Sequence, residues 1–178
     1  MNDYIIEPAK TEDYESILEL YNELHEVLEE CNPQKFRKIE KTEILITKEF
    51  FEKALNHEVN TNFEVYRING KTIGVVEYAV WDAYQNPGFI PCTVCVIGNI
   101  VVKKEYRNQG IGTHLFEYIK NKKCPEFDVQ RIELDMEAKN LNALSFYKKL
   151  GLIEDRIRFS MNVWKKLDNS EYLKIIIS

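Results

Sequence analysis

The segment Arg107-Asn108-Gln109-Gly110-Ile111-Gly112-Thr113 contains residue types that can bind phosphate through the main chain. An apolar, strand-like run (Ile97–Val102) precedes it, and a helical pattern (Gly112–Lys123) follows. Glycines at the start of a helix let a ligand approach the backbone, and the free N–H groups there attract anions. The sequence therefore predicts a phosphate-bearing ligand held by the main-chain amides from Asn108 to Thr113. No Gly-Lys-Ser/Thr follows, and the three-glycine spacing of a dinucleotide site is absent.

A second chemical group is the carboxylate of Glu77, which lies on a predicted strand, Thr72–Trp81, among apolar residues of the same face. Two interpretations remain open. Glu77 is either an edge residue that points into water or an acid in a pocket with an altered proton affinity.

The four cysteines do not predict a metal site. Cys92 and Cys95 have the spacing of half a zinc clamp, but no second Cys/His pair is near them. Within one strand this odd spacing places the two side chains on opposite faces. We expect free thiols and no bound metal.

Composition limits the class of protein. The chain has 178 residues, 44% hydrophobic and 30% charged, as expected for one globular domain over 1–178. The net charge of −5 disfavours nucleic acid as a partner, because that binding depends on Lys and Arg. No apolar run can span a bilayer and the N-terminus does not resemble a signal peptide, so we expect a cytoplasmic protein with no membrane partner.

Hydrophobic periodicity predicts an alternation of strands and helices. Strands are expected at Tyr4–Ile6, Phe63–Ile68, Thr72–Trp81, Thr93–Val102, Arg131–Glu137, Arg156–Val163 and Tyr172–Ile177, and helices between Thr11 and Pro33, after Thr47, over Gly112–Lys123 and from Asn140 to Gly151. Asn69-Gly70 predicts a tight hairpin. The acidic residues Glu23, Glu26, Glu29 and Glu30 form either a solvated helix face or the acidic wall of a substrate entrance.

A second motif indicates a protein family. Asn140-x-x-Ala143-x-x-Phe146-Tyr147-x-x-x-Gly151-Leu152 follows Val102-x-x-Glu105-Tyr106-Arg107-x-x-Gly110-x-Gly112, with a strand between them. In this order the pair resembles the GNAT superfamily of N-acetyltransferases. The resemblance covers about 93–153, fits the element order from 3 to 163 and says nothing of 164–178. It implies a mixed α/β fold with a central, mostly antiparallel sheet of six to seven strands flanked by about four helices.

The resemblance implies acetyl-coenzyme A as donor. In that family the segment equivalent to Arg107–Gly112 gives backbone amides to the pyrophosphate, and the strand equivalent to Ile100, Val101 and Val102 pairs with the pantetheine arm. That strand typically splays from the next one, here Arg131–Glu137. Asn140 matches a residue that hydrogen-bonds the pantetheine, although its side chain could equally cap the helix. The cofactor-binding core is then about 93–153, and the elements over about 11–90 shape the acceptor side.

The implied reaction is direct attack of a primary amine on the thioester. Tyr147 matches the residue that protonates the leaving thiolate, and a strand N–H near Val101 or Val102 is placed to stabilise the oxyanion. Many relatives carry a Glu or His on the strand before the pyrophosphate turn, where this chain has Gly98 and Asn99. Glu77 and Asp135 are the two alternatives for the general base.

The expected function is therefore acetyl transfer to the amine of a small molecule. Two alternatives remain: acetylation of a protein N-terminus or lysine, and a non-catalytic coenzyme A-binding sensor. The apolar end Ile175-Ile176-Ile177 would suit a homodimer contact. No sequence pattern identifies the acceptor.

Overall fold

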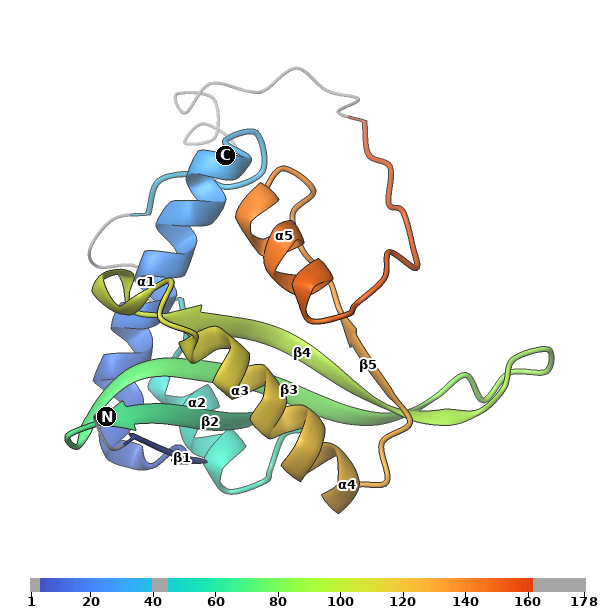
Figure 1. Cartoon of the computed structure of the whole chain (residues 1–178), viewed down its shortest axis with the longest axis horizontal. Helices are drawn as coiled ribbons and strands as arrows, with labels where there is room; N and C mark the ends of the chain where they lie inside the picture. Colours follow the sequence, from blue (N-terminus) through green and yellow to red (C-terminus); the bar gives the residue numbers. More distant parts are fainter. Residues whose placement is uncertain (1–3, 40–44, 162–178) are drawn as a thin grey trace, which may run out of the picture.

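A single five-stranded sheet organises the computed structural model, which describes residues 4–39 and 45–161 (Figure 1). In chain order the elements are β1 (Tyr4–Pro8), η1 (Thr11–Asp13), α1 (Tyr14–Cys31), α2 (Lys48–Leu55), β2 (Asn62–Ile68), β3 (Lys71–Ala83), β4 (Cys92–Val102), η2 (Lys104–Tyr106), α3 (Ile111–Tyr118), η3 (Ile119–Lys123), α4 (Cys124–Glu126), β5 (Arg131–Leu134) and α5 (Leu141–Lys149). The strand order is β1-β2-β3-β4-β5.

The sheet is mostly antiparallel, as the sequence predicts. The first four strands pair antiparallel, and only β4 and β5 run parallel. The hairpin between β2 and β3 turns at Asn69 and Gly70, whose φ angles of 49° and 76° match the left-handed turn predicted from this dipeptide. The mixed α/β fold is therefore confirmed.

Helices cover both faces of the sheet because successive strand residues point to opposite sides. On one face Val65 and Val75 pack with Ile17 of α1 and Phe51 of α2. On the other face Val76 of β3 packs among residues of α3 and η3, which cross the sheet in front of β3 and β4 in Figure 1. Each fully buried aliphatic side chain contributes about 1.5–3 kcal/mol, so these two layers fix the strands that carry the site.

The C-terminal part differs from the prediction. The strand expected over Arg131–Glu137 ends at Leu134. The strand expected over Arg156–Val163 does not form over 156–161, where Ile157, Phe159 and Met161 are 74%, 90% and 81% exposed. An alternating pattern becomes a strand only beside a hydrogen-bonding neighbour, and no strand of the described chain pairs with this segment. The run Tyr172–Ile177 and its suggested dimer contact lie outside the described residues.

A buried ion pair fixes the start of α1 to the sheet. The Asp13 side chain is 2% exposed and accepts hydrogen bonds from Arg67 Nη1 and Nη2, both at 2.7 Å, and from the Thr72 hydroxyl at 2.6 Å. Burial alone would raise the pKa of the Asp13 carboxyl, but the bonds from Arg67, Thr72 and the Lys10 N–H outweigh it and hold that pKa below its usual value.

Replacement of Asp13 by asparagine is expected to destabilise the fold by about 1–3 kcal/mol, because it removes the buried charge that Arg67 contacts twice and leaves Glu7, at 2.8 Å, as the remaining carboxylate partner of Arg67. Since the folded-state pKa of Asp13 is lowered, its contribution is present above the unfolded value of about 3.9 and is lost as the pH falls through the folded value. Urea unfolding at pH 7 and at pH 3 measures both effects. An equal loss of stability in the variant at both pH values would contradict the assignment.

Candidate active site

The strands β4 and β5 pair over only part of their length. The parallel ladder joins Val94–Ile97 to Arg131–Leu134 and ends there, whereas β4 continues to Val102. In Figure 1 β5 leaves the sheet toward α5 while β4 runs on beside β3. The last residues of β4, Gly98–Val102, therefore have a strand partner on the β3 side alone among the described residues. This divergence is the arrangement expected from the sequence.

Hydrogen-bond alternation determines which backbone groups of β4 face this open edge. The Lys103 N–H donates to the Ile73 carbonyl of β3 at 2.9 Å. Because donors alternate along an antiparallel strand, Val101 also faces β3, and Ile100 and Val102 face away from it. Of the two N–H groups suggested for oxyanion stabilisation, Val102 is thus the one directed to the open edge, and Val101 is directed to β3.

The turn between β4 and α3 presents its main chain outward. Asn108 and Gly110 have positive φ angles of 63° and 83°, and residues 108–110 are exposed. The first intrahelical bond of α3 runs from the His114 N–H to the Gly110 carbonyl at 3.0 Å. The N–H groups of Ile111, Gly112 and Thr113 precede that bond, so they are free for an anion, as the glycine spacing predicts.

Arg107 stabilises this turn from inside the protein. Its Nε donates to the Val102 carbonyl and its Nη2 to Glu23 of α1, both at 2.9 Å. Glu23 also accepts from the Lys104 N–H at 2.7 Å. The guanidinium of Arg107 is therefore engaged with the end of β4 and with α1. Binding of the pyrophosphate by the main-chain N–H groups of this segment stays a prediction.

Replacement of Glu23 by glutamine is expected to raise KM for acetyl-coenzyme A several-fold with a small change in kcat. The substitution weakens two hydrogen bonds to a carboxylate, which are about twice as strong as neutral ones. Initial rates at varied acetyl-coenzyme A measure the effect. The matched control is Glu26→Gln, an exposed position on the same helix. An equal response from both variants would show that Glu23 acts only through the net charge of α1.

A close contact joins the turn to α5. A Cβ added at Gly112 would lie 3.2 Å from the Phe146 ring, so glycine allows α5 to approach the start of α3. The next residue, Tyr147, is half-buried with its ring 5.1 Å from that of Phe146. Burial raises the pKa of the Tyr147 phenol above its ordinary value, so it stays protonated at neutral pH, as the role of an acid requires.

Glu77 occupies a polar position at the centre of the sheet. Its Oε2 accepts hydrogen bonds from the Tyr21 hydroxyl of α1 and from Asn99 Nδ2 of β4, both at 2.5 Å. No hydrogen bond within the described chain reaches its other oxygen, Oε1. Burial, together with the charge of Glu77 and the hydrogen bond to it, raises the pKa of the Tyr21 phenol, which therefore acts as a donor. The sequence singled out Glu77 but not its two partners.

The backbone of β4 makes room for this carboxylate. A register shift at Glu77 and Tyr78 places Glu77 opposite Asn99 and leaves Gly98 as the extra residue. A Cβ at Gly98 would lie 3.2 Å from Glu77 Cδ. The carboxylate of Glu77, which belongs to β3, thus lies over Gly98 of β4. By the family resemblance, many relatives carry a Glu or His of their own in this part of β4.

A pocket of about 350 Å³ opens in front of Glu77. Its polar lining residues are Tyr21, Thr47, Glu77 and Asn99, and its apolar ones are Leu45, Ile46 and Phe50. The pocket thus combines β3, β4, α1 and the start of α2, the elements expected to shape the acceptor side. Of the two interpretations of Glu77, the structure supports the acid in a pocket.

The other base candidate lies elsewhere. Asp135 follows the end of β5, is exposed and does not line the pocket. Asn140 is the N-cap of α5, where its Oδ1 accepts from the Ala143 N–H at 3.1 Å. This leaves the Asn140 amide N–H₂ for any ligand contact. His114 faces β1 and β2, since it lies 3.2 Å from the Tyr66 hydroxyl and stacks on Tyr4.

The described residues contain no cluster of three or more His, Cys, Asp or Glu side chains arranged to hold a metal ion. Cys95 is buried, Cys92 is only partly so, and both are free thiols. None of the described helices combines the length and the apolar character that a membrane crossing requires.

An open strand edge, a turn with free main-chain N–H groups and a carboxylate in a pocket thus meet on one α/β sheet. The model of the acetyltransferase (GNAT) family matches residues 16–152, and the chain belongs to that family. An N-alpha-acetyltransferase from Sulfurisphaera tokodaii is 26% identical over 102 residues. That match covers 56% of this chain and 61% of the relative, so the chain spans less than two thirds of that protein.

Solved structures show the same fold at low sequence identity. A tetramutant of the BH1408 protein from Bacillus halodurans superposes with a TM-score of 0.80 at 24% identity, covering 89% of this chain and 99% of that one. An aminoglycoside acetyltransferase from an uncultured soil metagenomic sample superposes with a TM-score of 0.65 at 20% identity, covering 90% of this chain and 97% of that one.

Proposed function

We propose that this chain transfers an acetyl group from acetyl-coenzyme A directly to the primary amine of a small molecule. The observation that carries the proposal is the position of Glu77, a carboxylate in a pocket beside the unpaired end of β4. Membership of the acetyltransferase family supports the class of reaction, and the pocket supports an acceptor small enough to enter it.

The residues present suit the donor. The N–H groups over Asn108–Thr113 would hold the pyrophosphate, and the outward backbone groups of Ile100 would pair with the peptide-like pantetheine arm. The amide of Asn140 would add a hydrogen bond. When bound, acetyl-coenzyme A supplies an activated thioester carbonyl.

The protein residues manage charge and protons. Glu77 Oε1 accepts the proton of the incoming ammonium, directly or through a water, so that the nitrogen lone pair becomes available. The nitrogen then forms a bond to the carbonyl carbon as the carbon–sulfur bond breaks, and it releases its second proton to water to give the neutral amide. The Val102 N–H stabilises the charge that develops on the carbonyl oxygen, and Tyr147 donates its proton to the departing thiolate. Glu77 and Tyr147 return to their resting states by exchange with solvent.

The test is release of coenzyme A thiol from acetyl-coenzyme A across a panel of primary amines, with mass spectrometry of the products. Acetylated amine together with stoichiometric thiol supports the proposal. Binding of acetyl-coenzyme A without turnover of any amine would instead support a non-catalytic sensor, the alternative from another class.

A protein acceptor is the second candidate, because an N-alpha-acetyltransferase is among the relatives. The free amine of a peptide N-terminus could reach Glu77 if only its first residue enters the pocket. Peptides with different first residues therefore belong in the amine panel. A peptide that exceeds every small amine in kcat/KM would assign the chain to this second class.

A further inference from the structure

We infer that the acceptor carries a single amino group on an apolar arm, and that Phe50 and Leu45 select for that arm. This inference rests on the proposed function, since it concerns the pocket in front of Glu77. It excludes polyamines and polycationic antibiotics as preferred acceptors. The pocket volume of about 350 Å³ lies at the small end of ligand pockets, which run from about 300 to 1,000 Å³.

The charge of the described pocket lining suits one cation. Among its described lining residues Glu77 is the only acidic side chain. Its Oε2 already accepts from Tyr21 and Asn99, which leaves Oε1 for the amine. A second ammonium in the same pocket would lose its hydration without gaining a counter-charge, and burial of an unpaired charge is strongly unfavourable.

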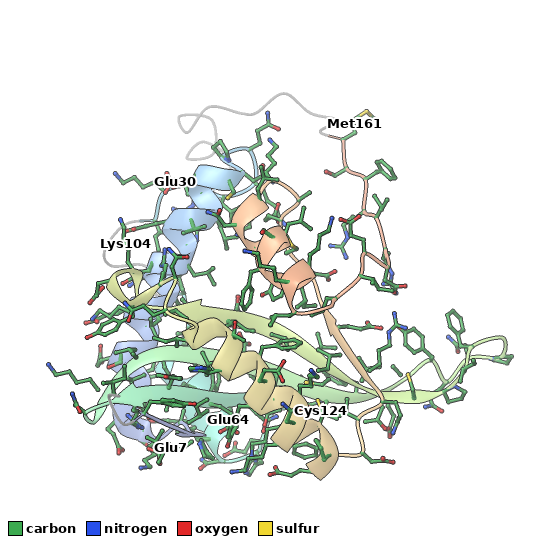
Figure 2. The ribbon with its side chains drawn as sticks, viewed as in Figure 1. Glu7, Glu30, Glu64, Lys104, Cys124 and Met161 are labelled. Carbon is green, nitrogen blue, oxygen red and sulfur yellow. The ribbon has the colours of Figure 1, made fainter. Side chains whose placement is uncertain are left out.

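The acidic residues of α1 do not add negative charge to the described lining of the pocket. Glu23 is neutralised by Arg107, and Glu26 and Glu30 are exposed and do not line the pocket. Figure 2 shows Glu30 near the C-terminal end of α1, on the part of the helix that projects beyond the sheet. None of Glu23, Glu26, Glu29 and Glu30 is among the described residues that line the pocket, so the pocket does not support the acidic-wall interpretation, and the exposed Glu26 and Glu30 fit a solvated face.

Apart from Thr47, the remaining described lining residues are apolar. Ile46 is buried, and Leu45 and Phe50 are each 37% exposed, so their side chains have apolar surface left to cover. Contact with an alkyl or aryl arm would remove that surface from water, which is favourable in proportion to the area covered. A polyhydroxylated arm, or an arm with a second cation, would gain no such favourable free energy from contact with Leu45 and Phe50.

The test compares amines that differ only in a second charge. Hexylamine and 1,6-diaminohexane have the same carbon chain, and 2-phenylethylamine adds an aryl arm. At pH 7.5 we expect kcat/KM for hexylamine to exceed that for the diamine by at least about tenfold, the discrimination that one group in an apolar pocket can supply. Spermidine, an aminoglycoside and an alanine-terminated peptide complete the panel.

A negative charge introduced at the rim of the pocket should weaken the preference for hexylamine over the diamine. Phe50→Glu places a carboxylate at the third position of α2. In the wild type the Phe50 N–H donates to Thr47 Oγ1 at 3.2 Å, so Thr47 caps the helix. Thr47 and a glutamate at this position form a capping box, so the variant keeps a stable helix start. We expect it to lower the hexylamine-to-diamine ratio at least about fivefold. Phe50→Leu is the matched control, which should keep the preference for hexylamine.

The outcomes separate this inference from the proposed function. Preference for hexylamine or phenylethylamine in the wild type, lowered by Phe50→Glu alone, supports the inference. Higher kcat/KM for the diamine, spermidine, the aminoglycoside or the peptide overturns it and leaves the acetyltransferase function standing. Absence of any turnover, with acetyl-coenzyme A binding intact, overturns both.

Discussion

Replacement of Glu77 by glutamine is expected to lower kcat/KM for the amine by about 100- to 10,000-fold, the contribution of a positioned proton acceptor. Glutamine has the shape of glutamate, and its carbonyl oxygen can still accept from Tyr21 and Asn99. The pocket therefore keeps its form and loses only its base. Steady-state rates at saturating acetyl-coenzyme A measure the loss.

The matched control for this experiment is Asp135→Asn. Sequence reasoning left Asp135 and Glu77 as equal candidates, and the structure leaves Asp135 exposed beyond β5 and outside the pocket. The control should retain activity within about twofold, because a surface group away from the pocket makes no proton transfer. If Asp135→Asn lost activity and Glu77→Gln kept it, the assignment of the base would be wrong.

Replacement of Tyr147 by phenylalanine is expected to lower kcat by about 100-fold or more while the Kd of coenzyme A stays nearly unchanged. The substitution removes the proton for the leaving thiolate and preserves the packing of the ring against Phe146. Single-turnover rates and equilibrium titration of coenzyme A separate the two effects.

The pH dependence gives a second check on Tyr147. Because burial raises the pKa of its phenol, the acid form persists above the ordinary value of about 10. Wild-type kcat should therefore show no alkaline loss from this group below about pH 10. Tyr84→Phe, which removes a phenol bonded to Glu133 outside the pocket, is the control. A similar fall in kcat in Tyr84→Phe and in Tyr147→Phe would show that the loss of activity in Tyr147→Phe is structural.

The sequence allowed the strands and the turn to be predicted because their signals are local. Alternation placed Glu77 on β3, and the glycine spacing placed the anion-binding amides at the start of α3. The partners of Glu77 could not be predicted in this way. Tyr21 is 56 residues and Asn99 22 residues from Glu77 in the sequence, and only the packing of α1 and the shifted register of β4 bring them together.

Other long-range contacts were equally hidden from the sequence. The guanidinium of Arg107 binds Glu23, 84 residues earlier, and the Val102 carbonyl. The acidic face of α1 was left open between a solvated face and a substrate entrance, and none of its four glutamates is among the described residues that line the pocket. The alternating run at Arg156–Val163 predicted a strand, but over 156–161 no neighbouring strand satisfies its backbone.

Figure 2 marks another buried acid, Glu64, with Cys124 on the α3 side of the sheet. Glu64 forms an ion pair with Lys123 at 3.2 Å, and both contribute to the packing of η3 rather than to the pocket. Burial raises the pKa of the Glu64 carboxyl, despite the opposing effect of Lys123. A perturbed carboxylate therefore does not by itself indicate the active site, and geometry beside β4 distinguishes Glu77.

The most direct test of this account is a crystal structure with coenzyme A bound. We expect the pyrophosphate to accept hydrogen bonds from main-chain N–H groups between Asn108 and Thr113, and the pantetheine arm to lie along the open edge of β4 at Ile100 and Val102. The sulfur should then lie between Glu77 and Tyr147. Coenzyme A bound away from this turn, or β4 and β5 paired along Gly98–Val102 with no room for the arm, would contradict it.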